Sequence, residues 1–316
     1  MRRGIVLGVL IAAFALSLVV AAQPQAGGGQ QAPRVIEVEK LKDNLFVLKG
    51  GGGNTAVFIT ANGVTVVDAK NPGWGQPILD KIKTLTDKPV TTLINTHTHG
   101  DHVSGNVEFP ATVDIVVQEN TKTNMEKMIP NSTAQDQTVP ATTIFQANSG
   151  RGLPKRTFKD KMTLGRGNDE IDLYYFGRGH TNGDAWVLFP SLRTVHAADI
   201  FSGKNVPLLD ANNGGSAVAI ADTLQKGYDA LKNVDTIITG HSTQMTMADL
   251  KEYIAFNREF LNDVRAARKA GKSVDEVAST WKIPPKYVGY AAADANRLKN
   301  NVRLAYNELG AATSSK

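Results

Sequence analysis

The amino-acid sequence predicts an α/β fold in which sheets are layered between helices in one domain. Runs rich in Val, Ile, Phe and Thr, typical of strands, are separated by glycine- and asparagine-containing turns. Segments with apolar residues three or four positions apart, typical of helices, follow these runs. Strands and helices alternate in this way in two similar blocks. Hydrophobic residues make up 41% of the chain and charged residues 21%, so the bulk of it is expected to be globular.

The predicted elements follow one another along both blocks. Strands are expected at 34–40, 44–49, 55–60, 63–69, 90–96, 114–118, 170–176, 185–189, 193–199 and 234–240. Helices are expected at 75–87, 120–128 and 217–233. From Met245 the chain is predicted to be helical to near its end, with a capping box at 273–276. Residues 130–155 are polar and contain three prolines, which predicts a long loop that is either functional or mobile.

The first residues predict export from the cytoplasm. Two arginines precede an apolar run that ends in small residues, so residues 1–22 are expected to be a signal peptide, followed by a linker over 23–34. The alternative is an uncleaved membrane anchor, because 19 largely apolar residues nearly suffice to span a bilayer. Cleavage would give a periplasmic or secreted protein, and the membrane would be a partner only if the segment stayed uncleaved.

Charge and cysteine content exclude several classes of function. The formal net charge is +5, but no five like charges occur in a row, so no nucleic-acid partner is expected. The chain has no cysteine, which excludes thiolate ligands and thiol catalysis. An exported domain without disulfides depends on its core, and on metal where metal is bound.

The segment 95–102, "NTHTHGDH", holds three of the six histidines and one aspartate. Zinc takes imidazole nitrogens at about 2.0–2.1 Å and carboxylate oxygens at about 2.0–2.2 Å. In an extended segment, residues two apart point the same way, so His97 and His99 are predicted to bind one ion. Asp101 and His102, where the chain turns, are predicted to face a second ion.

The rest of such a site must come from other parts of the chain. His180 lies in "GRGHTNGD" and His241 in "TGHST", and each follows a predicted strand and is flanked by glycine. "HAADIF" adds His196 and Asp199 at the end of another strand. Functional side chains are often carried on loops of this kind.

These motifs, in this order and at this spacing, resemble the metallo-β-lactamase-fold superfamily of hydrolases. The resemblance covers roughly Asn44 to Ser242. It implies an αββα four-layer sandwich over residues 35–244, with metals at the sheet edge. Residues 245–316 would form a helical C-terminal extension packed on the same domain.

The resemblance also implies a ligand set for two zinc ions. The first ion would be bound by His97, His99 and His180, the second by Asp101, His102 and His241, and Asp199 would bridge both. Asp68 matches an aspartate that supports the site from behind, although the glycine-containing turn that usually follows is here Ala69–Lys70. Iron or manganese are the alternative metals.

The ligand set also divides the superfamily. Lactamase classes with a cysteine ligand do not fit, because cysteine is absent. The other main lactamase class lacks a bridging aspartate, whereas Asp199 is present here. The set is more similar to glyoxalase II thioesterases and acyl-homoserine lactonases. Diiron oxygen-reducing relatives have a glutamate where His99 stands.

His196 is not expected to bind metal. In a regular strand over 193–199, His196 and Asp199 point to opposite faces, so both cannot reach the ions. His196 is therefore predicted to lie in the core or on the far face.

The predicted function is hydrolysis of a carbonyl compound by two zinc ions. A hydroxide held between them would attack an ester, lactone, thioester or β-lactam, with Asp101 as the catalytic residue that orients it and shuttles the proton. The alternatives are a mononuclear iron oxidoreductase of the persulfide-dioxygenase type, a β-lactamase proper and a non-catalytic metal-binding protein. The iron alternative leaves His102 and His241 unexplained.

Some features keep two interpretations. Gly50–Gly53 is either a mobile flap or a permissive hairpin turn. Lys204 either meets a substrate carboxylate or is a surface lysine. The helical tail either packs on the domain or forms a homodimer contact. A small-molecule substrate is expected in every enzymatic interpretation.

Overall fold

The computed structural model describes residues 34–133 and 138–314. The predicted signal peptide and nearly all of the predicted linker lie outside the described residues. Among the helices that the structure describes, none is both long and apolar enough to cross a membrane.

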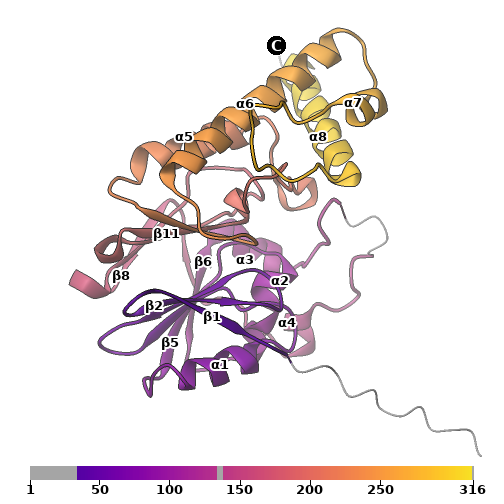
Figure 1. The fold of residues 1–316 in the computed structure, drawn as a ribbon. Coiled ribbons are helices and arrows are strands. Elements are labelled where there is room, and N and C mark those ends of the chain that lie inside the picture. The colour runs from indigo at the N-terminus through magenta and orange to yellow at the C-terminus, as the bar shows by residue number, and fades with distance from the viewer. Residues whose placement is uncertain (1–33, 134–137, 315–316) are drawn as a thin grey trace, which may run out of the picture. The chain divides into compact units, whose positions relative to one another are not determined.

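The described strands form a seven-stranded and a five-stranded sheet (Figure 1). The first sheet contains, in spatial order, β1 (Glu37–Lys42), β2 (Leu45–Lys49), β3 (Thr55–Ile59), β4 (Val64–Val67), β5 (Val90–Ile94), β6 (Asp114–Gln118) and β7 (Arg156–Phe158). The second contains β12 (Thr236–Thr239), β11 (Thr194–Ala198), β10 (Trp186–Phe189), β9 (Ile171–Tyr174) and β8 (Lys161–Leu164). Strands β1 to β4 pair antiparallel, whereas β4 to β7 and the β11–β12 pair are parallel.

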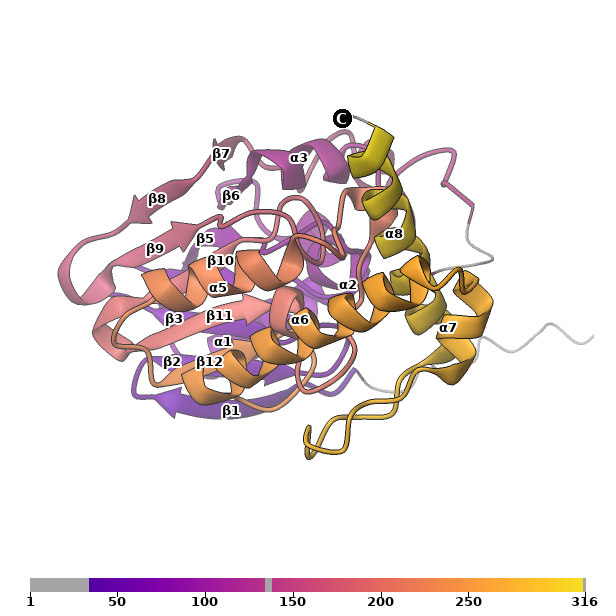
Figure 2. The ribbon, with the colours of Figure 1, turned by 90° about the horizontal axis from the view of Figure 1, so that it is seen from above.

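Helices cover the outer face of each sheet. The helices are α1 (Gly75–Lys83), α2 (Gly100–Val103), α3 (Glu119–Met125), α4 (Ile144–Ala147), α5 (Ile220–Ala230), α6 (Met247–Lys269), α7 (Val274–Thr280) and α8 (Ala295–Ser314). On α1, Ile78 and Ile82 are one turn apart and pack against the first sheet. Helices α5 and α6 lie over the second sheet (Figure 2).

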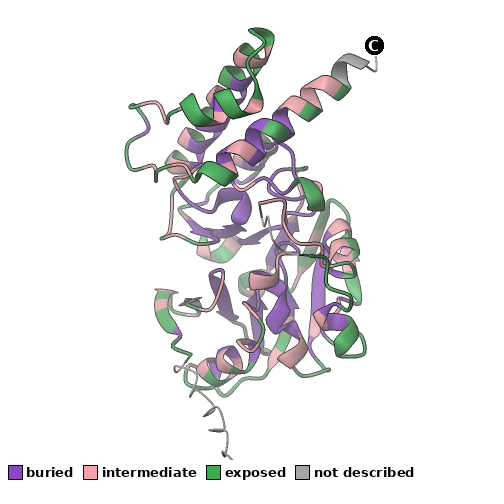
Figure 3. Cartoon of the chain, turned by 90° about the vertical axis from the view of Figure 1, so that its right-hand side faces the viewer, coloured by how far each residue is buried: buried purple, intermediate pink, exposed green. Residues whose placement is uncertain are grey.

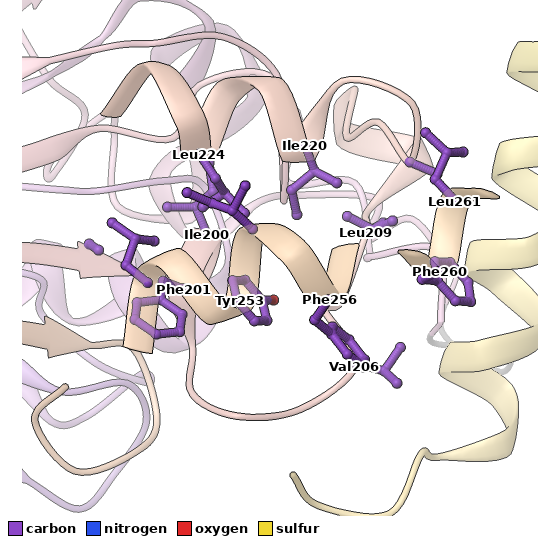
Figure 4. Close-up of a cluster of buried hydrophobic side chains, with 14 of the residues drawn as sticks. Ile200, Phe201, Val206, Leu209, Ile220, Leu224, Tyr253, Phe256, Phe260 and Leu261 are labelled. Atoms are coloured by element: carbon purple, nitrogen blue, oxygen red, sulfur yellow. The ribbon is translucent and has the colours of Figure 1, made fainter. Parts of the chain in front are cut away.

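Three apolar layers therefore hold the elements together. Leu45 and Phe58 of the first sheet pack against Leu173 and Phe189 of the second. The layer above the second sheet joins Trp186 of β10 to side chains of α5, α6 and α8, part of which Figure 4 shows. Figure 3 shows the burial concentrated in the strands and on one side of the long helices. The predicted αββα four-layer sandwich is confirmed.

The predicted boundaries are wrong in three places. The C-terminal part is not continuously helical, because Pro284 and Pro285 cannot continue a helix and 281–294 is irregular. The predicted loop over 130–155 contains the short α4, which starts with a capping box of Thr143 and Gln146. Strands β7 and β8 were not predicted, because they are too short to show a clear alternation of apolar and polar residues. The predicted capping box at Ser273 and Glu276 does begin α7.

Candidate metal centre

The seven predicted ligand residues lie at the carboxyl ends of strands from both sheets. His97 and His99 follow β5, and Asp101 and His102 lie in α2, the turn that comes next. The other three residues belong to the second sheet: His180 follows β9, Asp199 follows β11 and His241 follows β12. The fold therefore brings together residues as much as 144 positions apart, from His97 to His241, at one edge.

These side chains form two groups. Within each group, the ligand atoms all lie within 4.8 Å of one another. The first group is His97, His99, His180 and Asp199, and the second is Asp101, His102 and His241. In the first, His99 Nδ1 lies 3.0 Å from His180 Nε2. In the second, His241 Nε2 lies 3.3 Å from Asp101 Oδ2.

Asp199 connects the two groups. Its Oδ1 lies 3.3 Å from His102 Nε2 and its Oδ2 lies 3.3 Å from His241 Nε2, both in the second group. Its Oδ2 also lies 3.8 Å from His180 Nε2 in the first group. The carboxylate thus stands between the imidazoles of both groups.

The donor set fits divalent metal ions. His97 is buried, and its Nε2 has no hydrogen-bond partner among the described residues. A buried nitrogen without a partner costs stability, and a metal ion at this position would remove that cost. Imidazole nitrogens and carboxylate oxygens without sulfur suit zinc, and also iron or manganese.

The outer nitrogen of four imidazoles is fixed by a hydrogen bond, which orients the ring and leaves the other nitrogen facing the group. The pairs are His97 Nδ1 with Thr96 Oγ1 at 3.0 Å, His99 Nε2 with Asp210 Oδ2 at 2.8 Å, His102 Nδ1 with Asp68 Oδ2 at 2.7 Å, and His180 Nδ1 with Leu208 O at 2.6 Å. Asp68 thus lies behind the site. Asp210 and Leu208 were not expected, since no motif marks them.

The site is strongly anionic. Burial would raise the pKa of the Asp199 carboxyl, but His102 and His241 hold it well below its usual value. Burial would lower the pKa of His241, but Asp101 and Asp199 raise it to about 9. The carboxylates gathered here are Asp68, Asp101, Asp199 and Asp210. The charge of four carboxylates equals that of two divalent cations, and without cations the raised pKa values of His102 and His241 let these two imidazoles offset part of it.

The glycine turn 50–53 joins the antiparallel strands β2 and β3 and is packed beneath the second group; φ is positive at Gly50, Gly51 and Gly52, which fits the predicted permissive hairpin turn. A Cβ on Gly53 would lie 2.1 Å from the His102 ring, and one on Gly52 would lie 2.5 Å from the backbone oxygen of Asp101. Gly53 N also donates to Asp101 O at 3.1 Å. The glycines let the backbone approach the ligand residues closely.

Replacing Gly53 with alanine is expected to displace His102. Because the added methyl group overlaps the ring, the second metal ion should be lost before the first, and stability should fall by about 1–3 kcal/mol. Metal analysis of the purified variant should give one ion per chain where two are predicted for the wild type. The matched control is Gly271→Ala, where nothing lies within 4 Å of a Cβ; its φ of +77° strains an alanine, so stability should fall, but its metal content should not change. Two tightly bound ions in Gly53→Ala would contradict this.

Lys70 replaces the glycine expected after Asp68. The residue is fully buried with φ +66°, a conformation that favours glycine. Its Nζ donates to Leu48 O at 2.9 Å and to Gly53 O at 2.7 Å, on either side of the glycine turn. Burial lowers the pKa of Lys70 to about 8, against the attraction of Asp68 and Asp101. Lys70 therefore fastens the turn that underlies His102.

His196 is in neither ligand group. It is buried, with Nε2 3.1 Å from Asn54 O, and Ala198 N donates to its Nδ1 at 3.2 Å. The prediction for His196 assumed a regular strand in which His196 and Asp199 point to opposite faces. This assumption is wrong, because β11 is irregular between His196 and Ala198 and φ of Ala198 is +47°. This bend at the strand end directs Asp199 toward the ligand groups.

Lys204 is not available to a substrate carboxylate. Its Nζ lies 3.0 Å from Asp249 and 3.1 Å from Glu252, both on α6. It is also more than a plain surface lysine, since these ion pairs tie its loop to the helix.

A cavity of about 650 Å³ opens beside the ligand groups. His99 and Asp101 form part of its wall. Its other lining residues are Asn71, Thr98, Gly100, Ser104, Met128, Ile129, Pro130, Asn131, Thr138, Pro140, Thr142 and Ile144. Among these described residues none is a lysine or an arginine. Part of the predicted loop 130–155 thus borders the space next to the ligands.

The αββα sandwich and the cluster of histidines and aspartates at its edge point to one class of protein. Residues 48–241 match the family model described as "Metallo-beta-lactamase superfamily". The chain belongs to this superfamily, whose members are generally hydrolytic enzymes. The predicted resemblance is confirmed.

Several known proteins are similar to the chain. A metallo-β-lactamase type 2 from Elizabethkingia meningoseptica is 29% identical over 231 residues, which are 67% of this chain and 81% of the relative. Among solved structures, a metallo-β-lactamase from Pontibacter korlensis has a TM-score of 0.56 at 18% identity, over 71% of this chain and 99% of the other. The sec-alkylsulfatase Pisa1 from Pseudomonas sp. has a TM-score of 0.68 at 15% identity, over 87% of this chain and 50% of the other. At these identities the structural likeness shows the fold.

Proposed function

We propose that the protein is a binuclear zinc metallohydrolase that cleaves an ester, lactone, thioester or β-lactam bond. The observation that carries the proposal is the pair of ligand groups joined by Asp199 at the wall of a cavity. His97, His99 and His180 would hold one ion, Asp101, His102 and His241 the other, and Asp199 would contact both. Two bound zinc ions would supply an acidified water and polarise the carbonyl oxygen of the substrate.

Asp101 is the residue of the chain that we assign to catalysis. Its side chain is 31% exposed, whereas those of His102 and Asp199 are almost fully buried. Because Asp101 lines the cavity, its carboxylate can orient the attacking water, accept its proton at Oδ2 and pass it to the leaving group. Oδ2 lies 3.3 Å from His241 Nε2, so the two groups stand close enough to share the second ion.

The cavity lining favours an uncharged acyl substrate. Met128, Ile129, Pro130, Pro140 and Ile144 supply apolar surface. The absence of lysine and arginine from the described lining leaves a substrate carboxylate without a cationic partner there. We therefore place neutral esters and lactones ahead of β-lactams that carry a carboxylate.

The apolar first segment of the sequence supports export to the periplasm or the exterior. A homodimer contact through the helical tail stays a proposal.

The second candidate is the mononuclear iron oxidoreductase. It uses only part of the ligand set, whereas Asp101, His102 and His241 form a complete second group. Metal analysis of protein from its native source separates the two: two zinc ions per chain support the hydrolase, and one iron supports the oxidoreductase.

A hydrolysis screen tests the reaction itself. The substrates are a neutral aryl ester, a lactone, a thioester, nitrocefin and a secondary alkyl sulfate, each with the zinc-loaded enzyme. Turnover of the ester or lactone above that of nitrocefin supports the proposal. Preferred cleavage of nitrocefin would make the protein a β-lactamase, and no hydrolysis of any carbonyl substrate would overturn the proposal.

A further inference from the structure

The segment Val206–Asp210, here the 206–210 segment, contacts two imidazoles of the first ligand group. Leu208 O lies 2.6 Å from His180 Nδ1, and Asp210 Oδ2 lies 2.8 Å from His99 Nε2. Asp210 N donates to His180 O at 2.9 Å, so the segment also holds the backbone of the histidine loop. The position of this segment sets how far apart His99 and His180 lie.

The 206–210 segment belongs to no helix or strand, so its backbone carbonyls need partners from elsewhere. Three of them are bound by one element, α8. Arg297 donates to Val206 O at 3.2 Å, Asn301 to Pro207 O at 2.7 Å and Asn300 to Leu209 O at 2.8 Å. The carbonyls of residues 206, 207 and 209 thus accept from α8, and the carbonyl of residue 208 between them bonds to His180.

Packing anchors the segment on the same side. The side chains of Val206 and Leu209 lie in the apolar cluster with Phe256 and Phe260 of α6 (Figure 4). Leu298 of α8 belongs to the same cluster. Asn300 and Asn301 are buried. Removing the Asn301 amide leaves Pro207 O without its α8 donor in the interior, and removing the Asn300 amide leaves Leu209 O with only the Ser132 hydroxyl at 3.1 Å.

Another contact from α8 reaches the other side of the histidine loop. Glu308 accepts from Val218 N at 3.0 Å and lies 3.6 Å from Arg178. Arg178 precedes His180 by two residues and donates to Gly214 O and Gly215 O. Gly215 N in turn donates to Asp210 O at 2.7 Å. The helix therefore contacts the structure around His180 at two places.

We propose that Asn300 and Asn301 are positioning residues for the first metal ion, and that α8 acts on this ion through the 206–210 segment. The inference rests on the proposed metal site. It assigns to the C-terminal extension a part in metal binding, although none of its residues belongs to either ligand group.

The test is zinc affinity of the full chain carrying Asn300→Ala and Asn301→Ala together, measured by competition with a chromophoric chelator. Removal of a partner that orients a ligand typically weakens metal binding by 10–100-fold, so the first zinc should bind about tenfold more weakly. The second zinc should bind nearly as in the wild type. With Co²⁺ in the first site, the visible absorption should shift, because the angle between the His99 and His180 rings changes.

The matched control is Asn307→Ala, which removes an exposed asparagine from the same helix and should leave affinity and spectrum unchanged. If the double variant does not fold, Asn301→Ser and Arg297→Met, measured singly, should weaken the first zinc in the same direction. Wild-type affinity and an unchanged Co²⁺ spectrum in folded variants would overturn the inference, even with a lower melting temperature. Failure of the wild type to bind two ions would instead refute the proposed function.

Discussion

Replacing Asp101 with alanine is expected to lower kcat by about a hundredfold or more, while the first metal ion stays bound. Asp101 is the carboxylate among the ligand residues that line the cavity, and the first group of ligands does not include it. In the proposed mechanism, loss of Asp101 removes the acceptor for the proton of the attacking water and one ligand of the second ion. Steady-state kinetics on the best substrate of the screen, with metal analysis of the same sample, measures both effects.

Two comparisons make the Asp101 result specific. Asp101→Asn keeps the size of the side chain but not its charge, and should lose nearly as much activity as Asp101→Ala. Asp87→Ala, at an exposed aspartate in the loop after α1, should behave as the wild type. An unchanged rate in Asp101→Ala would contradict the proposed role.

Removing the metal should abolish hydrolysis and lower the melting temperature by roughly 10 °C. The ligands follow strands of both sheets, so bound ions link the two halves of the sandwich. An ion at a thousand times its dissociation constant stabilises the fold by about 4 kcal/mol, and each kcal/mol corresponds to about 2–4 °C in a chain of this size. Thermal unfolding with a chelator, and again after zinc is restored, measures the shift.

The control for metal removal is a variant with His97→Ala and His99→Ala. It lacks two ligands of the first ion, so chelator and zinc should change its melting temperature much less. Equal melting temperatures of the wild-type protein with and without chelator would show that metal does not stabilise the fold.

Much of the fold was predictable from the sequence, because the apolar residues that mark its strands and helices are also the residues that pack in the core. The strand run at 236–239 is short, rich in β-branched residues and followed at once by Gly240 and His241. Such runs place their last residues at the sheet edge, so the motifs also indicated which residues would meet. That these residues bind metal stays a prediction, although the structure brings them together.

What could not be predicted depends on contacts between distant segments. Asp210 is 111 residues from His99 and lies in "DANNGG", which reads only as a turn. The role of the glycine turn becomes visible only when Gly53 lies against His102. The break in the C-terminal helices could have been predicted from the sequence, because Pro284 and Pro285 lie at the break itself.

The border of the cavity between Met128 and Ile144 has a consequence for how this chain can diverge. These residues lie between β6 and β7 and supply none of the seven ligand atoms. Substitutions there change which molecules enter while leaving the reacting groups in place. If the proposed function holds, substrate choice is expected to change through single border residues while the ligand groups stay intact.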